Sequence, residues 1–331
     1  MKINTSASGK VFLSGEYMAL EGGRALILST PQEAKVTIGK NSEQNNIFTS
    51  SMSQYGFPFV LDRKLNITWL DKDPKDLGKI LRYAIKKFGR NFNGKTIHID
   101  TDEFFHNDKK IGIGSSEAVS VSLSKALNKL FKLKLDTKNL IDYSKEIHDK
   151  SQNSTGSGFD IIAAYEEGAV NCILLEEGEY TYDQIMLPDD LLITGVINEV
   201  SSKTSDMITN YQKAKYDHPD FFVSHMNVMK KKLEDFNKSL MLRNSDQMLF
   251  HLESYSNLMI EMDNHFRLGI YNNQHLEILK LTHSQKILYK PSGAGAGDLG
   301  ILVTNDSIKL NEFCQRLNSL GIKTFKIFSK N

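Results

Sequence analysis

The chain has 331 residues, with 41 lysine and arginine against 40 aspartate and glutamate residues, so its formal net charge is +1. This balance excludes an overall field that attracts a nucleic acid or an anionic membrane, while the length suffices for one large or two smaller domains. The two cysteines are far apart, the amino terminus lacks a signal-peptide pattern, and no run approaches the ~18 apolar residues of a membrane span, so we expect a soluble, cytoplasmic protein without disulfides.

The first half of the chain combines strand and helix patterns. Alternation of apolar and polar residues predicts strands at 10–13, 25–28, 34–38, 57–60 and 95–100. Apolar residues at helical spacing predict a helix at 77–85 that ends near Gly89. Two further helices are expected at 117–127, with Val119, Leu123 and Leu127 on one face, and at 140–148.

The second half begins around an acidic break at 176–179, which two predicted strands flank at 170–175 and 191–197. The pattern is then helical over 205–281, and the last segment, 286–328, reads as strand, glycine loop, helix and strand. We therefore expect a mixed α+β protein with domains at 1–185 and 186–331.

The first of three glycine-bearing segments runs from Ser8 to Gly23. A strand is expected to leave a turn at Gly9 with Lys10 at its start, where the ammonium group can meet phosphates. The alternative is a solvent-facing lysine on an edge strand.

The second segment stands at the start of a predicted helix and consists of Gly112, Ile113, Gly114, Ser115 and Ser116. The N-terminus of a helix exposes N–H groups and partial positive charge, and glycines let the backbone approach an anion closely. This pattern matches neither a P-loop nor the Gly-x-Gly-x-x-Gly fingerprint. The alternative is a simple serine-capped turn.

The third segment, Lys290–Gly300, has four glycines in its last eight positions. This density predicts an ordered loop packed against a ligand or another backbone, and the alternative is a decorated hairpin turn. Asp298 within it is either a buried cap or a carboxylate that faces a substrate.

In this order and spacing, the three segments resemble the motifs of the GHMP kinase superfamily, which includes galactokinase, homoserine kinase, mevalonate kinase and phosphomevalonate kinase. The resemblance spans nearly the whole chain. It implies a two-domain α+β fold, with an N-terminal domain like ribosomal protein S5 domain 2, a ferredoxin-like C-terminal domain, and an active site in the cleft between them.

A fourth segment, His148–Asp160, is similar to the pattern His-x-x-x-Gln-x-x-x-Gly-Ser-Gly-Phe-Asp of the phosphomevalonate kinase subfamily. The sequence Gly-Ala-Gly-x-Gly-Asp at 293–298 and the sequence at 15–22 look like the same subfamily. Two departures leave room for an altered substrate. Glu117 stands where the superfamily usually has alanine or glycine, close enough to repel a phosphate, and Glu166–Gly168 replaces a small-residue ending.

The resemblance implies transfer of the γ-phosphoryl group of ATP to 5-phosphomevalonate, with Mg²⁺. Lys10 and Asp160 match the catalytic positions: Lys10 stabilises developing charge, and Asp160 acts as a base on a hydroxyl or orients an acceptor that is already ionised. Residues Gly112 to Ser116 hold the ATP phosphates, and Ser116 and, as a second candidate, Asp149 hold the metal. The expected substrate-binding residues are Lys10, Glu16, Tyr17, Ser157, Gly158, Lys203, Thr204, Ser292, Gly293, Ala294, Gly295 and Asp298.

Several alternatives stay open at this point. Lys203, with its neighbours Ser201, Ser202 and Thr204, is either an acceptor-phosphate cluster or an exposed polar turn. The rival functions are a mevalonate kinase, a kinase for a sugar, and a non-catalytic binding protein on a kinase scaffold. We expect small-molecule partners only, no nucleic acid or membrane, and a monomer or homodimer.

Three side-chain groups are interpreted as structural. Trp69 is expected to be a partly buried packing residue. The methionines at 226, 229, 241 and 248 are expected in a helix core, and the histidines at 218, 225, 251 and 265 show no metal-ligand spacing.

Overall fold

The computed structural model describes residues 2–153, 156–175, 179–198, 204–283, 285–297 and 299–329, without the side chains of Thr204 and Ser205. They form two compact units: unit 1 comprises Met1–Lys10, Pro31–Asp108 and Gly114–Glu167, and unit 2 comprises Val11–Thr30, Lys109–Ile113 and Gly168–Asn331. Strands β1 (Ile3–Ser14) and β2 (Arg24–Lys40) each run from one unit into the other. The division after residue 185 stays a prediction.

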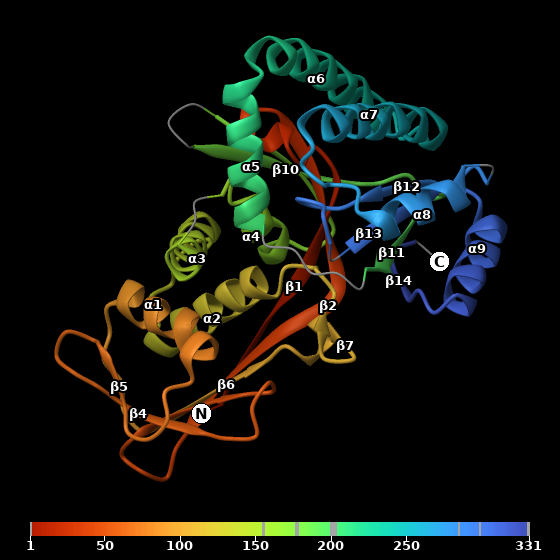
Figure 1. Ribbon diagram of the computed structural model, residues 1–331. Helices are drawn as coiled ribbons and strands as arrows, with labels where there is room; N and C mark the ends of the chain where they lie inside the picture. Colours follow the sequence, from red (N-terminus) through yellow and green to blue (C-terminus); the bar gives the residue numbers. More distant parts are fainter. Residues whose placement is uncertain are drawn as a thin grey trace. The chain divides into compact units, whose positions relative to one another are not determined.

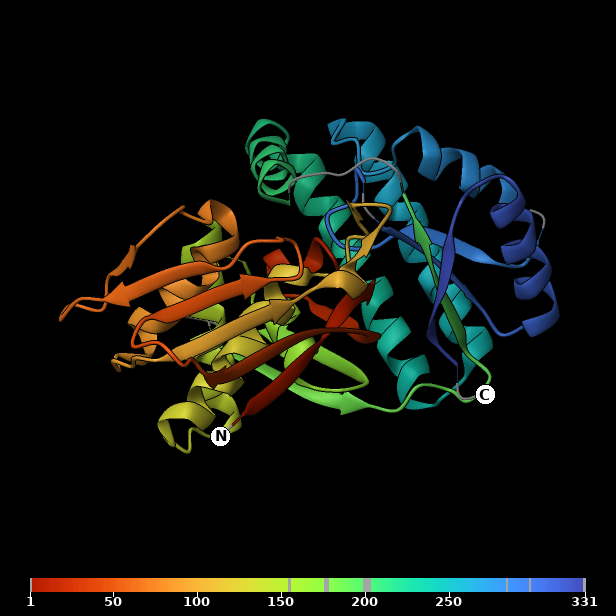
Figure 2. The same ribbon diagram turned by 90° about the horizontal axis from the view of Figure 1, so that it is seen from below.

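Unit 1 has a mixed sheet with helices on one face (Figures 1 and 2). Its strand order is β2-β6-β3-β4-β5, with β1 beside β2. The strands are β3 (Asn46–Ser50), β4 (Phe57–Leu61), β5 (Ile67–Trp69) and β6 (Lys95–Asp100), and a short β7 (Phe105–His106) follows. The helices are η2 (Lys75–Gly78), α1 (Lys79–Phe88), η3 (Asp102–Phe104), α2 (Ser115–Phe131), α3 (Thr137–Gln152) and α4 (Phe159–Tyr165).

The alternation of β6 explains why one face of the unit 1 sheet is covered. Ile97 and Ile99 are buried, while Thr96 and His98, which alternate with them, are partly exposed. The predicted apolar stripe of α2 is buried as expected, and α1 ends at Gly89 in a left-handed conformation. Trp69 packs against three phenylalanines of the sheet, which confirms its structural interpretation.

Unit 2 contains a four-stranded antiparallel sheet in the order β12-β13-β11-β14. Its strands are β11 (Leu192–Ile197), β12 (Leu288–Pro291), β13 (Leu299–Thr304) and β14 (Thr324–Phe328). Helix α8 (Asn273–Thr282) precedes β12, α9 (Ser307–Ser319) connects β13 to β14, and both contribute to one apolar core with the sheet. This strand order with these two helices is ferredoxin-like, as predicted.

The sheet that contains β2 continues in unit 2 in the order β10-β9-β2, with β9 (Ala169–Leu174) and β10 (Tyr180–Ile185). The elements η1 (Met18–Glu21) and β8 (Lys109–Lys110) are short. The helical region predicted at 205–281 is confirmed by α5 (Thr204–Asp217), α6 (Pro219–Met241), α7 (Ser245–Phe266) and α8. Helices α6 and α7 pack side by side (Figure 1).

Three details of the predicted fold were wrong. β1 passes straight through Gly9 and Lys10, so Lys10 lies within a strand and not after a turn. The strands expected at 25–28 and 34–38 are one strand, β2. Pro31 does not interrupt it, because this residue falls between the stretch that pairs with β9 and the stretch that pairs with β6, where no N–H group is needed for these ladders. Met241 is 73% exposed, unlike Met226, Met229 and Met248, which are buried.

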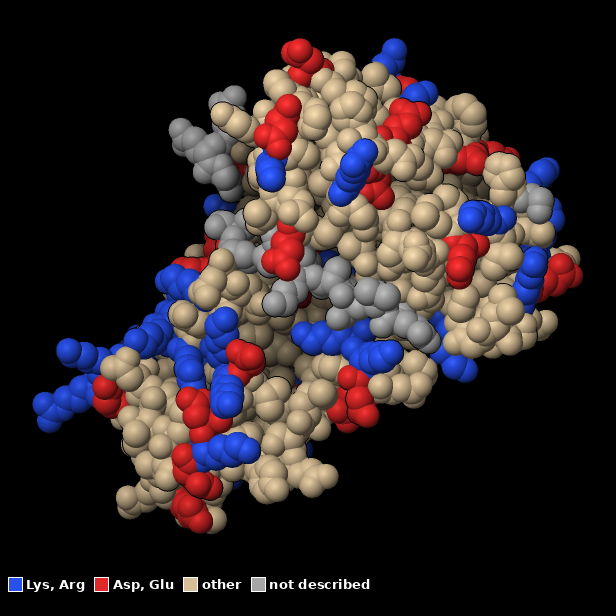
Figure 3. All heavy atoms as spheres, viewed as in Figure 1, with Lys and Arg blue, Asp and Glu red and all other residues tan. Residues whose placement is uncertain are grey.

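The distribution of charged side chains and the hydropathy of the helices agree with the composition. Basic and acidic side chains of the described residues are interspersed over the face in Figure 3. No helix among the residues described is both long and apolar enough to cross a membrane.

Candidate active site

Lys10 and Asp160, the predicted catalytic residues, form an ion pair in unit 1. The Nζ atom of Lys10 lies 2.7 Å from Oδ2 of Asp160, and their side chains are 12% and 28% exposed. Asp160 stands in the first turn of α4, whose N-cap residue, Gly158, has a φ of +79°. Ser157 accepts a hydrogen bond from the N–H of Phe159 at 3.4 Å, so the Gly-Ser-Gly turn orients the start of the helix.

The predicted phosphate loop leads into α2. Gly114 is the N-cap residue with a φ of +79°, and the first helical hydrogen bond runs from Ala118 N to Gly114 O at 3.1 Å. A helix leaves the N–H groups of its first turn without intrahelical partners, which suits an anion. Gly112 and Ile113 belong to unit 2, with Gly112 also at positive φ and Ile113 buried.

Gly114 is a glycine because the side chain of Lys10 occupies the adjacent space. A Cβ atom at this position would lie 2.8 Å from Cε of Lys10 and 3.1 Å from its Cγ. The glycine therefore allows the strand lysine to lie against the loop.

We expect Gly114→Ala to lower kcat/KM roughly 10- to 100-fold, because the new methyl group displaces Lys10 from the loop. The left-handed conformation also costs about 1–2 kcal/mol of stability for a residue with a side chain. Gly89→Ala is the matched control, since Gly89 has a φ of +62° and a Cβ atom added there would have nothing within 4 Å. Unfolding and kinetic measurements on both variants should show similar losses of stability, but a loss of activity only for Gly114→Ala. Equal activities would contradict the role given to this contact.

Ser116, the next loop residue, contacts an acid and a histidine that the sequence did not link. Its Oγ donates to Oε2 of Glu117 at 3.0 Å and lies 3.2 Å from Nε2 of His148, which is 3.5 Å from Oε1 of Glu117. Burial by itself raises the pKa of Glu117, but the positive charges of His148 and Lys10 hold it below its usual range. Burial likewise lowers the pKa of His148, and the carboxylates of Glu117 and Asp149 outweigh this and raise it.

Asp149, the second candidate metal ligand, lies beside this group. Its Oδ2 accepts from Nζ of Lys145 at 2.6 Å, and its Oδ1 is 3.8 Å from Nδ1 of His148. Burial alone raises its pKa, whereas the neighbouring His148 and Lys145 lower it overall. The stem of Lys145 in turn packs over Gly158, where a Cβ atom would lie 2.7 Å from its Cδ.

The oxygen atoms of Ser116 and Asp149 are chemically suitable ligands for magnesium. Mg²⁺ prefers oxygen ligands and is commonly held by one or two carboxylates together with substrate phosphates. The described residues contain no group of three or more His, Cys, Asp or Glu side chains arranged around a metal ion. The hydroxyl of Ser116 and the carboxylate of Asp149 are oxygen ligands of the kind that holds Mg²⁺ together with a nucleotide.

The first and third motifs meet within unit 2. The Oγ of Ser292 accepts from the N–H of Phe12 at 2.8 Å and donates to the carbonyl of Phe12 at 3.1 Å. The hydroxyl of Tyr17 donates to the carbonyl of Ala294 at 2.7 Å. The loop joins antiparallel β12 and β13, and these bonds give it the ordered conformation that its glycines predicted.

Two predicted substrate-binding residues are buried in this part of unit 2. Glu16 is 7% exposed and forms an ion pair with Lys290, which is fully buried, and Tyr17 is 2% exposed. Gly295 fits against Ile270, whose carbonyl would be 2.8 Å from a Cβ atom, while Gly293 has nothing within 4 Å of such an atom. Lys203 and Asp298 lie outside the described residues, as does the side chain of Thr204, which begins α5.

Sequence reasoning assigned no role to His148 and Lys145, on consecutive turns of α3, or to Lys290 in β12, although His148 and Lys290 begin two of the quoted motifs. The first two share a helix face with Asp149, but no local pattern reveals contacts with α2 and Gly158. Lys290 stands among apolar strand residues, and a lysine in such a position is a signal for a buried ion pair.

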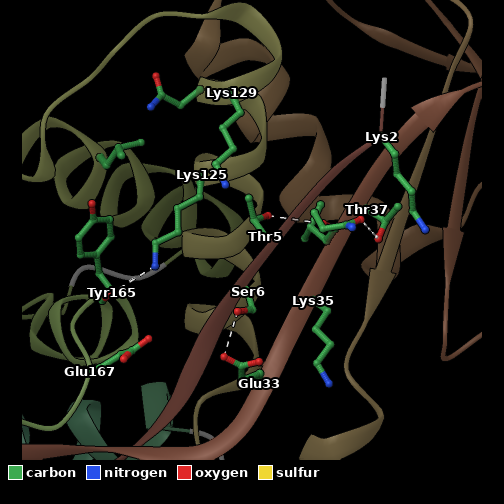
Figure 4. Close-up of a pocket in the computed structure, with 14 residues that line it drawn as sticks. Lys2, Thr5, Ser6, Glu33, Lys35, Thr37, Lys125, Lys129, Tyr165 and Glu167 are labelled. Carbon is green, nitrogen blue, oxygen red and sulfur yellow. Dashed lines mark hydrogen bonds between the residues drawn. The ribbon is translucent and has the colours of Figure 1, made fainter.

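A pocket of about 820 Å³ lies elsewhere in unit 1, along the C-terminal half of α2 (Figure 4). Lys125 lines it, with its ammonium 3.4 Å from the carbonyl of Tyr165 and 4.4 Å from the centre of that ring. Three more lysines line the pocket, and the carboxylates of Glu33 and Glu167 offset part of their positive charge. One of these lysines, Lys35, forms an ion pair with Glu103. At 1.5 Å per residue, Lys125 is about 15 Å along the helix from Ser115, so the pocket is separate from the phosphate loop.

Comparison with known proteins agrees with the predicted family. Residues 77–168 match the family model described as GHMP kinases N terminal domain. A curated phosphomevalonate kinase of Saccharolobus solfataricus is 25% identical over 324 residues, which cover 94% of this chain and 93% of the relative.

Two solved structures show the same fold. Streptococcus pneumoniae phosphomevalonate kinase, in complex with phosphomevalonate and AMPPNP, matches with a TM-score of 0.79 and 21% identity over 98% of this chain and 100% of that one. L. major mevalonate kinase, in complex with R-mevalonate, matches with a TM-score of 0.74 and 16% identity over 99% of this chain and 96% of that one. The α+β fold predicted from the resemblance is confirmed, whereas the location of the active site between two domains stays a prediction.

Proposed function

We propose that this chain, which has the GHMP kinase fold and the family's N-terminal domain at residues 77–168, is an ATP-dependent kinase that phosphorylates 5-phosphomevalonate. The product is 5-diphosphomevalonate, an intermediate of the mevalonate pathway of isoprenoid biosynthesis, and we place the reaction in the cytoplasm. The observation that carries the proposal is the Lys10–Asp160 ion pair beside the N-terminal turn of α2. The similarity to a phosphomevalonate kinase along nearly the whole chain supports the choice of acceptor.

Phosphoryl transfer requires positioning and neutralisation of charge more than covalent chemistry by the protein. The N–H groups at the start of α2 bind the nucleotide phosphates, and the ammonium of Lys10 stabilises charge on the transferring group. Asp160 fixes Lys10 and faces the acceptor. A phosphate acceptor is already ionised near neutral pH, so Asp160 orients it and does not need to remove a proton. Mg²⁺, when bound through Ser116 and Asp149, neutralises part of the nucleotide charge.

The second candidate function is mevalonate kinase. The fold that the chain shares with L. major mevalonate kinase, solved in complex with R-mevalonate, supports it. The ion pair of Asp160 with Lys10 is also compatible with a base that acts on a hydroxyl acceptor. In that case the cluster predicted around Lys203 is not required for a second phosphate.

An assay of ADP release with ATP, Mg²⁺ and a panel of acceptors tests the proposal. We expect kcat/KM for 5-phosphomevalonate to exceed that for mevalonate at least about 100-fold, since a site built to bind a phosphate discriminates strongly against an analogue that lacks it. A preparation of Asp160→Ala, purified in the same way, controls for contaminating kinases. Turnover of mevalonate alone would favour the second candidate, and turnover of no acceptor would favour a binding protein.

A further inference from the structure

Glu117 is the acid that stands at the expected phosphate site. It follows Ser116 in the first turn of α2, and its side chain is only 14% exposed. A Cβ atom on Gly114 would lie 3.2 Å from Oε2 of Glu117, so the carboxylate folds back over the loop itself. An uncompensated charge here would repel a phosphate.

The surroundings of Glu117 compensate this charge. His148 from α3 places its Nε2 atom 3.5 Å from Oε1 of Glu117, and the side chain of Lys10 from β1 lies against the same glycine, Gly114, as the carboxylate. Lys10 is shared, because it also pairs with Asp160 from α4, while Asp149 pairs with Lys145 on the same helix, α3. Glu117 therefore lies among groups of both charge signs and is not an isolated negative charge at the loop.

The hydrogen-bond roles around Ser116 are fixed by this arrangement. A serine hydroxyl has one donor and two lone pairs, and an ionised carboxylate can only accept. Since Ser116 donates its proton to Glu117, the contact with His148 at 3.2 Å requires an N–H of the imidazole as donor. One lone pair of Ser116 then remains, and a lone pair suits a cation and not the oxygen of a phosphate.

We propose that Glu117 and His148 are positioning residues that turn the hydroxyl of Ser116 into an acceptor for the divalent cation carried by the nucleotide. This inference rests on the proposed kinase function and assigns a role to the residue by which the chain departs from its superfamily. In this proposal the pair acts through Ser116.

Calorimetric titration with a non-hydrolysable ATP analogue and Mg²⁺ tests this inference through a double-mutant cycle. We expect Glu117→Ala to weaken binding about 10-fold or more, as is typical when a partner of a metal ligand is removed. In the Ser116→Ala background the same substitution should change affinity less than about twofold, because the residue through which it acts is gone. Glu117→Gln, whose amide oxygen still accepts from Ser116, should recover most of the affinity.

Titrations without Mg²⁺ separate positioning from a purely structural role. A positioning role predicts that Glu117→Ala has little effect without the metal, whereas general damage to the loop weakens binding equally in both conditions. Glu146→Ala is the control, because Glu146 is also an ion-paired glutamate of unit 1 but pairs with Lys87 and Lys150. Its affinity should equal that of the wild type.

The outcomes distinguish this inference from the function on which it rests. A wild-type protein that binds the analogue, with an equal loss for Glu117→Ala in both backgrounds or with no loss at all, overturns the inference and leaves the kinase function standing. A wild-type protein that binds no nucleotide overturns both.

Discussion

Lys10→Met is expected to lower kcat roughly 10³-fold, because in the proposed mechanism the substitution removes the cation that stabilises charge on the transferring phosphoryl group. Asp160→Asn should lower kcat only about 10- to 100-fold if the acceptor is a phosphate, which needs no base. With a hydroxyl acceptor the same variant should lose roughly 10³- to 10⁴-fold, since general-base catalysis is lost as well. The relative size of the two losses therefore reports the chemistry of the acceptor.

Steady-state kinetics at saturating ATP measure both variants, with thermal unfolding as the check on folding. The two residues form one ion pair, so the double variant should lose much less than the product of the single losses. Wild-type turnover in both single variants would remove Lys10 and Asp160 from the catalytic machinery. It would leave the phosphate loop as a binding site alone.

The site in unit 1 could be predicted largely from local sequence. Gly114 and Ser116 predict a helix N-terminus suited to an anion, and Asp160 follows a Gly-Ser-Gly turn. Each of these residues can therefore be identified from its neighbours in the sequence. The partners of these residues cannot. From the sequence, Glu117 is predicted to repel a phosphate. The structure places His148, 31 positions later in the chain, beside it. Charge compensation depends on tertiary packing, which periodicity does not reveal.

The helices were predicted more accurately than the long strands for a similar reason. The stripe of Val119, Leu123 and Leu127 repeats over several turns, so α2 was identified within a few residues of its ends. The first half of β1 consists mainly of small polar residues that are also common in turns, and Pro31 interrupts the pattern of β2. In both strands the neighbouring strands determine the conformation.

Lys290→Met is expected to destabilise the protein by about 3–5 kcal/mol, because it leaves the carboxylate of Glu16 buried without its counter-charge. Lys290 is fully buried and also donates to the carbonyl of Pro291 at 2.7 Å. Among the described residues, the second carboxylate oxygen of Glu16 has no hydrogen-bond partner.

Adding Glu16→Gln to Lys290→Met should recover much of this loss, since the buried charge is then removed with its partner. Lys215→Met is the control in the same unit: Lys215 pairs with Glu21 at 2.7 Å but is 41% exposed, so its loss should cost less than about 1 kcal/mol. Denaturant unfolding measures the free energy of unfolding of the wild type, the two single variants and the double variant. If the double variant is as unstable as Lys290→Met, the loss comes from packing around the lysine stem. If instead Lys290→Met is no worse than Lys215→Met, the Glu16–Lys290 pair does not hold the first motif against the third loop.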